Sequence, residues 1–219
     1  MYTRRITGAQ TENRQAISFL AGGSPHPNGG TNASLRIVEK ELTDAGVVVE
    51  YAHIGALSIR GCIACYSCKK TGKCAIANDP VNATIDLMKQ ADGIIIASPV
   101  YYGGIAGTLK SFLDRAFFAG SGFGFKVGAA VVVSRREGGI STFHEINNYF
   151  NLAQMIIAPS RYWISVHGNN EEELIQDKEG VQMLKTVARN MAWLMKAVAA
   201  APSREIGEDE AKREVTNFI

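Results

Sequence analysis

Short apolar runs alternate along this chain with segments whose apolar residues recur at spacings of three and four. The runs contain few polar residues, which is typical of strands buried in the middle of a parallel sheet. They cover residues 16–23, 47–54, 93–98, 126–134 and part of 156–166. The segments between them predict helices over about 31–45, 80–92, 105–118, 141–155 and 179–200. This alternation predicts an α/β fold, with a doubly wound parallel sheet of five strands in a single domain.

Individual residues predict where two of the helices begin. Thr31 or Asn32 is expected to cap the first helix with its side-chain oxygen. Asp79 is expected to cap the helix that follows the cysteine-rich segment, with Pro80 at the first helical position. Ligands in doubly wound sheets bind beyond the carboxyl ends of the strands. We therefore expect the functional site in the loops after the first, third and fourth strands.

Length and composition restrict the domain organisation and the partners. The chain has 219 residues, of which 46% are hydrophobic and 20% charged, as in ordinary globular domains. We expect an N-terminal extension over 1–15, one domain over 16–200 and a charged C-terminal tail over 201–219. The formal charge of +2 is too small to indicate nucleic acid or an anionic membrane as a partner. No apolar run approaches the roughly 20 residues that span a bilayer, and the start lacks a secretory signal, so we expect a cytoplasmic protein.

The loop after the first strand reads GSPHPNGGTN and is suited to a phosphate group. Short polar side chains and two glycines precede a helix whose first N–H groups and positive dipole end attract anions. A nucleoside triphosphate is not expected, because no lysine follows Gly30 as in a P-loop. The dinucleotide pattern G-x-G-x-x-G is also missing from this loop. The alternative is an ordinary loop leading into a capped helix.

The next two candidate loops, SPVYYGG (98–104) and SRREGG (134–139), are suited to a flat ring. Glycine and proline expose backbone groups to the polar edge of such a ring, and Tyr101 or Tyr102 is able to stack on its face. The arginines of the second loop are able to neutralise negative charge on the ring. The alternatives are tyrosines half-buried in loop packing and arginines that are merely solvated. No Ser-His-Asp set or G-x-S-x-G motif indicates a hydrolase, and we identify no catalytic side chain.

The four cysteines of the chain lie in one short segment over 61–74, with the spacing C-x2-C-x2-C-x5-C. A disulfide framework would distribute its cysteines over distant segments, so a metal or redox role fits better. The first two spacings, which join the first three cysteines, match those of bacterial ferredoxins, and the longer last spacing allows the fourth thiolate to return to the same cluster. Two alternatives remain, namely a zinc site, which usually pairs two separated C-x2-C knuckles, and free thiols.

These motifs together resemble a known family. The segments GSPHPNGGTN, SPVYYGGIAGTLKSFLDR and SRREGG are similar to the flavin-contacting loops of the NAD(P)H-dependent FMN reductase family, which has a flavodoxin-like fold. The resemblance covers about residues 16–200, and the cysteine spacing resembles that of its iron–sulfur flavoprotein branch. His26 and Pro27 are a departure, because many relatives have Arg or Lys soon after the serine-proline of the first loop. The extension over 1–15 also has no counterpart in the family pattern.

The resemblance implies a set of ligands and the residues that bind them. The cofactor would be FMN, with NAD(P)H as the electron donor and a [4Fe–4S] cluster as a candidate second centre. The phosphate of FMN would be held by Ser24, Pro25, Asn28, Gly30, Thr31 and Asn32. Its ring would be held by Pro99, Val100, Tyr101, Tyr102, Gly103, Gly104, Ser134, Arg135, Arg136, Gly138 and Gly139. The cluster would be bound by Cys62, Cys65, Cys68 and Cys74.

The resemblance also implies an activity and partners. The expected protein is an FMN-dependent oxidoreductase that passes electrons from NAD(P)H to an acceptor such as a quinone, a flavin or a ferredoxin. It would form a homodimer or homotetramer in which FMN and cluster lie near a subunit interface. The alternatives are a quinone or nitro reductase and a non-enzymatic, flavodoxin-like electron carrier.

Overall fold

A parallel sheet forms the centre of the computed structural model, which describes residues 15–202 and Arg204. Its strands lie in the order β2-β1-β3-β5-β6, and their pairings are all parallel. A further strand, β7, extends the sheet beside β5, and β4 pairs with β3 in an antiparallel hairpin. The strands are β1 (Ile17–Gly22), β2 (Val48–His53), β3 (Gly93–Tyr101), β4 (Gly104–Ile105), β5 (Val127–Ser134), β6 (Ile156–Ile157) and β7 (Ser165–His167).

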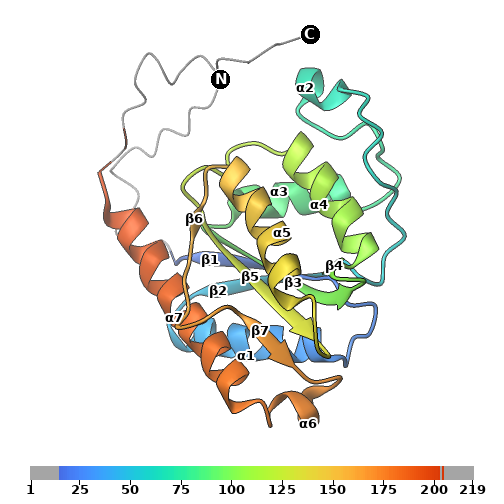
Figure 1. Ribbon diagram of the computed structural model, residues 1–219. Helices are drawn as coiled ribbons and strands as arrows, with labels where there is room; N and C mark the ends of the chain where they lie inside the picture. The colour runs from blue at the N-terminus through green and yellow to red at the C-terminus, as the bar shows by residue number, and fades with distance from the viewer. Residues whose placement is uncertain (1–14, 203, 205–219) are drawn as a thin grey trace, which may run out of the picture.

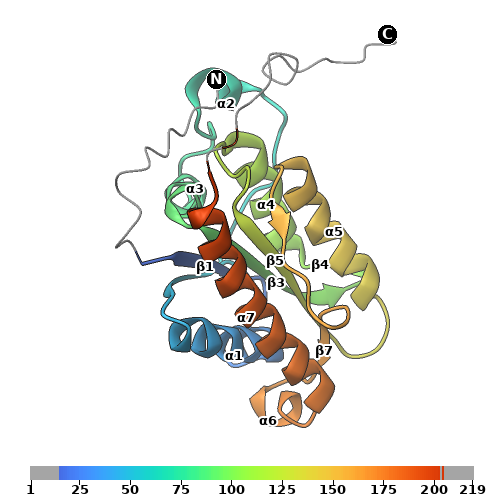
Figure 2. The same ribbon diagram turned by 90° about the vertical axis from the view of Figure 1, so that its left-hand side faces the viewer.

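Helices cover both faces of this sheet, as Figures 1 and 2 show. One apolar core lies between the sheet and α3, α4 and α5, and the other between the sheet and α1 and α7. Because side chains alternate along a strand, Ile94 and Ile96 enter the first core and Ile95 the second. The helices are α1 (Gly30–Asp44), α2 (Ser67–Thr71), α3 (Val81–Gln90), α4 (Gly107–Ala119), α5 (Gly139–Leu152), α6 (Glu171–Leu174) and α7 (Lys178–Ala200). The predicted doubly wound architecture is confirmed.

The strand order creates one point at which the chain changes direction across the sheet. From β1 the chain passes through α1 to β2 on one side, whereas β3 lies on the other side of β1. The loops that follow β1 and β3 therefore leave adjacent strands in opposite directions. This topological switch point is where ligands bind in open α/β sheets.

The fifth predicted strand is divided, which differs from the prediction of one continuous strand within 156–166. β6 ends at Ile157, and the chain returns to β5 only at Ser165. Proline has no N–H group for a ladder bond, so Pro159 interrupts the pairing directly after Ala158 has donated to the carbonyl of Gly128.

Both predicted helix caps are wrong. α1 already begins at Gly30, with Gly29 at the cap position and no side-chain cap bond, so Thr31 and Asn32 lie inside the helix. Pro80 occupies the cap position of α3 rather than its first turn. Asp79 precedes it and accepts a hydrogen bond from the N–H of Val81 at 3.2 Å, but its carboxylate also binds Arg115.

Part of the predicted organisation cannot be compared with the structure. The N-terminal extension lies outside the described residues except at Gln15, and so does the C-terminal tail except at residues 201, 202 and 204. Within the described part of the chain, no helix is long and apolar enough to span a membrane. The short elements α2, α6 and β4 were not predicted, because each has too few residues to show a periodic pattern.

The packing of α5 on β5 gives a first prediction. A Cβ atom added at Gly128 would lie 2.9 Å from the buried ring of Phe150, so we expect Gly128→Ala to lower the free energy of unfolding by about 1–3 kcal/mol. Gly107 begins α4 and has open space around it, so Gly107→Ala is expected to raise that free energy by up to about 1 kcal/mol. Urea denaturation of both variants measures these changes in the free energy of unfolding. Equal changes in the two variants would contradict the packing of Phe150 against Gly128.

Candidate functional site

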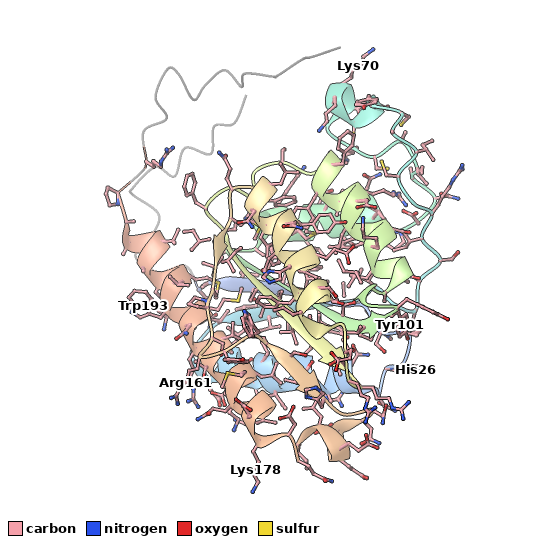
Figure 3. The ribbon with its side chains drawn as sticks, viewed as in Figure 1. His26, Lys70, Tyr101, Arg161, Lys178 and Trp193 are labelled. Atoms are coloured by element: carbon pink, nitrogen blue, oxygen red, sulfur yellow. The ribbon has the colours of Figure 1, made fainter. Side chains whose placement is uncertain are left out.

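Three loops meet at the carboxyl-terminal edge of the sheet. The N–H of Gly23, directly after β1, donates to the carbonyl of Ala97 in β3 at 2.8 Å. The loops after β3 and β5 also touch, because a Cβ atom added at Gly138 would lie 2.8 Å from the Cα of Gly103. Gly138 has a φ of +88°, a conformation that glycine adopts without strain. Figure 3 shows His26 of the first loop and Tyr101 of β3 at the same corner of the molecule.

A hydrogen-bond network fixes the shape of the first loop. The side-chain amide of Asn32 donates to the carbonyl of His26 at 2.8 Å and accepts from the hydroxyl of Tyr51 at 2.6 Å. His53 bonds the carbonyl of Ser24 through Nε2 at 2.6 Å, which requires the proton on Nε2 because a carbonyl only accepts. Burial raises the pKa of Tyr51, so its hydroxyl remains a donor at neutral pH. Asn32 therefore stabilises the loop through its side chain.

The start of α1 leaves polar groups available inside this loop. The first intrahelical bond runs from Ala33 to Gly29, so the N–H groups of Thr31 and Asn32 have no partner within the helix. Among the described residues, none bonds the hydroxyl of Thr31 or the side chain of Asn28. Ser24 is 5% exposed, and its hydroxyl accepts from the N–H of His26 at 3.2 Å. This arrangement fits an anion and differs from the alternative of an ordinary capped helix.

A fourth loop, which the sequence analysis did not include, covers the first. The N–H of Gly30 donates to the carbonyl of Asn169 at 2.9 Å, and Gly29 and Asn170 form an isolated β-bridge. A Cβ atom at Gly30 would lie 2.1 Å from the carbonyl oxygen of Gly168, so only glycine fits there. The N–H of Gly30 is thus used within the protein. Gly168, directly after β7, was the sequence signal for this contact between the two loops.

The loop after β3 exposes both tyrosines. Pro99 and Val100 lie within β3, which then turns through Gly103 to Gly104 in β4. Tyr101 is 45% exposed, and Tyr102 is fully exposed with a positive φ of +50°. The alternative of tyrosines half-buried in loop packing therefore does not describe Tyr102, and both rings are accessible to a ligand.

The loop after β5 borders a polar cavity of about 360 Å³. Ser134 is buried beside Ser165, whereas Arg135 and Arg136 are exposed. Burial opposes the charge of Asp177, but hydrogen bonds from the N–H groups of Gly180 and His167 and from the side chain of His167 together lower its pKa, so it stays charged. The residues around the cavity come from the ends of β5, β7 and the elements after them, and they are Arg135, His167, Gly168, Asn169, Glu173 and Asp177.

The four cysteines surround one small cavity, together with apolar side chains such as Ile63 and Phe118. Ala64 and Tyr66, on either side of Cys65, have positive φ angles of +50° and +57°, which are strained for residues other than glycine. Such strain persists where the surroundings impose it, and it is frequent at functional sites. Across the described residues, no three His, Cys, Asp or Glu side chains approach closely enough to hold a single ion.

A buried arginine, which the sequence analysis did not identify as functional, holds the cysteine-rich segment. Arg115 in α4 is 1% exposed, and its guanidinium donates to both carboxylate oxygens of Asp79 and to the sulfur of Cys74. The hydrogen bond from Arg115 lowers the pKa of Asp79, so the pair is fully charged at neutral pH. In the sequence, Arg115 stands three residues after Phe112 and four before Ala119, so it falls on the apolar face of the helix. A cation at such a position was the available signal.

The two candidate sites lie at opposite ends of α4. The helix begins just after β4, beside the loops of the sheet edge, and ends at Ala119 beside the cysteine cavity. Its 13 residues, at a rise of 1.5 Å each, make the helix about 20 Å long. In Figure 3, Lys70 of α2 lies at the top of the molecule, whereas Tyr101 and His26 lie lower on its right side.

Known proteins resemble this chain in sequence. A family model described as NADPH-dependent FMN reductase matches residues 18–170. An iron-sulfur flavoprotein of Methanocaldococcus jannaschii is 32% identical over 185 residues, which cover 80% of this chain and 95% of that protein. An iron-sulfur flavoprotein of Methanosarcina thermophila is 28% identical over 188 residues, which cover 82% and 96% of the two chains.

Solved structures resemble it in fold. RosB with a bound 8-demethyl-8-formylriboflavin-5'-phosphate superposes with a TM-score of 0.68 at 10% identity, covering 93% of this chain and 96% of that one. An archaeal flavodoxin superposes with a TM-score of 0.58 at 14% identity, covering 82% of this chain and 99% of that one. An NADH:FMN oxidoreductase in its apo form superposes with a TM-score of 0.58 at 16% identity, covering 86% of this chain and 92% of that one. The prediction of a flavodoxin-like fold is confirmed.

The network around Asn32 gives a second prediction. Tyr51→Phe removes the hydroxyl that donates to Asn32, which is 4% exposed, so we expect the free energy of unfolding to fall by about 1 kcal/mol. Tyr162 is 61% exposed, and among the described residues its hydroxyl has no partner, so Tyr162→Phe is the matched control with no expected change. Urea denaturation measures both, and equal midpoints for the two variants would show that the network does not stabilise the loop.

Proposed function

Because this chain belongs to the NADPH-dependent FMN reductase family, we propose that it is an FMN-dependent oxidoreductase that accepts electrons from NAD(P)H. The observation that supports this function is the meeting of three loops at the switch point of the sheet. One loop presents unpaired helix N–H groups, and the other two present exposed tyrosines and glycine backbone.

The first loop would bind the phosphate of FMN. The N–H groups of Thr31 and Asn32, the hydroxyls of Ser24 and Thr31 and the amide of Asn28 are its candidate donors. The positive end of α1 adds to the attraction for the anion. No Arg or Lys stands beside these donors in the loop, so neutral donors and the helix would carry the binding. Gly30 and the side chain of Asn32 would support the loop rather than contact the phosphate.

The loops after β3 and β5 would bind the ring. Pro99, Val100 and Gly103–Gly104 provide backbone at its polar edge, and Tyr101 or Tyr102 would stack on its face. Arg135 and Arg136 would supply positive charge near the reduced ring. When bound, FMN accepts electrons in pairs and releases them singly or in pairs, so the protein needs to supply only binding, orientation and electrostatics. No side chain is required as a general acid or base.

The cysteine-rich segment would bind a [4Fe–4S] cluster. All four cysteines line one cavity, which apolar side chains also border. Clusters of this type are held by four cysteine thiolates. The relatives named as iron-sulfur flavoproteins support the same interpretation.

A second subunit would complete the path between the two centres. Within one chain, the cysteine cavity and the loops of the sheet edge are separated by the length of α4, and electron transfer slows steeply with distance. In a homodimer or homotetramer, the cysteine segment of one subunit is able to approach the flavin loops of another. The final acceptor would be a quinone, a flavin or a protein such as a ferredoxin.

Steady-state oxidation of NADPH and NADH by the FMN-loaded protein tests the proposed activity. We expect turnover when a quinone or free FMN is added as the acceptor. Reversible photoreduction of the bound FMN without any oxidation of NADPH or NADH would instead identify a flavodoxin-like electron carrier.

Loss of a hydroxyl from the phosphate loop gives a third prediction. Thr31→Val keeps the size and branching of the side chain but removes one donor to the phosphate, so we expect the Kd for FMN to rise about tenfold or more. Thr186→Val makes the same chemical change on the outer face of α7 and should leave the Kd unchanged. Isothermal titration calorimetry measures both, and an unaltered Kd in Thr31→Val would remove this hydroxyl from the proposed site.

Loss of one thiol gives a fourth prediction. In protein purified without oxygen, Cys65→Ala should abolish the bound iron and the absorption shoulder that dithionite bleaches, while FMN remains bound. Lys70→Ala changes an exposed residue of the same segment and should retain both centres. Iron and flavin assays measure the two contents. Iron at wild-type stoichiometry in Cys65→Ala would exclude this thiol as a ligand.

A further inference from the structure

Every hydrogen bond that the structure gives the guanidinium of Arg115 ends on residues 60–79, which enclose the four cysteines. Its NH1 group donates to the carbonyl of Arg60 at 3.1 Å, and its NH2 group donates to that of Ile76 at 2.8 Å. The same two groups bind the carboxylate of Asp79, one oxygen each. The Nε–H donates to the sulfur of Cys74 at 3.3 Å. This fully buried side chain thus ties the two ends of the cysteine segment to α4.

Cys74 is held more firmly than the other three cysteines. The side chain of Asn82 bonds both backbone groups of Cys74, accepting from its N–H and donating to its carbonyl, each at 2.9 Å. With Arg115 on the sulfur, three atoms of this residue are fixed. Cys62 and Cys65 are exposed, and among the described residues no group bonds their sulfurs. The sulfur of Cys68 makes one long contact, donating to the carbonyl of Phe118 at 3.9 Å. Cys74 is therefore the anchored member of the set.

We propose that Arg115 positions Cys74 as a ligand of the cluster and raises the reduction potential of that cluster through the Nε–H···Sγ hydrogen bond. This inference rests on the proposed [4Fe–4S] site. A donor to a ligating sulfur withdraws electron density from the cluster and stabilises its reduced, more negative state. Only arginine suits the position, because its planar fork binds the carboxylate of Asp79 with one edge and reaches the sulfur with Nε.

Asp79 balances the charge of this arginine. Its side chain is 7% exposed, and the pair carries no net charge, so the direct bond to the sulfur is the main effect that Arg115 exerts on the cluster. Removal of the carboxylate charge would leave an uncompensated cation beside the cluster and favour its reduced state. Arg115 thus raises the reduction potential of the cluster, and Asp79 lowers it.

Arg115→Lys tests the hydrogen bond, because lysine keeps the charge and the partner Asp79 but has no Nε–H at the sulfur. We expect the midpoint potential of the cluster to fall by about 59 mV or more, a tenfold change for one electron. The measurement is an anaerobic dithionite titration followed by the EPR signal of the reduced cluster, with iron and FMN contents determined on the same sample. Arg36→Lys is the matched control, because Arg36 pairs with Glu171 on the other face of the sheet, and no shift is expected there.

Asp79→Asn provides an independent test that leaves the bond to sulfur in place, and its midpoint potential should rise. Opposite shifts in the two variants support the proposal, because simple loosening of the segment would move both in the same direction. Arg115→Lys protein that keeps FMN and fold but loses iron supports the positioning role. If Arg115→Lys does not fold, the direction in which the midpoint potential shifts in Asp79→Asn decides whether the proposal stands.

Two results would overturn the inference. Full iron content with an unchanged potential in Arg115→Lys, or no upward shift in Asp79→Asn, would show that the arginine only supports the loop, while the proposed cluster would stand. Wild-type protein that retains FMN but no iron after anaerobic reconstitution would overturn the cluster itself, and this inference with it.

Discussion

The parallel pairing of β1 with both β2 and β3 is the constraint on which the rest of the structure depends. It makes all the central strands end at one edge, so that the loops after β1, β3, β5 and β7 meet there. Contacts between these loops leave no room for side chains at Gly30 and Gly138. The same contacts leave the start of α1 with unpaired N–H groups. A phosphate and a flat ring are the ligands that such an edge is suited to bind.

Helix α4 joins this edge to the cysteine-rich segment. It begins directly after the hairpin that carries Tyr101 and Tyr102, and its last turns carry Arg115, which binds the segment around Cys74. Backbone strain occurs at both ends. In the part of the chain that the structure describes, five residues other than glycine have a positive φ, and three of them, Ala64, Tyr66 and Tyr102, lie in these two regions. The stretch from Tyr101 to Ala119 therefore contributes to the proposed flavin site at one end and supports the proposed cluster at the other.

Periodic signals predicted the fold well, because five apolar runs with helices between them are compatible with few other architectures. Caps and interruptions were predicted less well. Thr31 or Asn32 was expected to cap the start of the first helix, but that helix begins at Gly30, whose N–H donates to the carbonyl of Asn169. Pro159 divided a strand that was expected to be continuous. Motifs indicated the three loops and the cysteines. The supporting residues Tyr51, His53, Asn82 and Arg115 were missed because their partners lie on other elements or loops, which the sequence pattern does not bring together. Only the position of Arg115 on an apolar helix face was visible beforehand.

The central claim is that the edge of the sheet binds one flavin mononucleotide through its phosphate and its ring. Titration of the flavin-free protein with FMN, followed by the fluorescence of the flavin, tests it most directly. The account predicts saturable quenching with one FMN per chain, and much weaker quenching of riboflavin, which lacks the phosphate. Unquenched fluorescence in the presence of excess folded protein would contradict it.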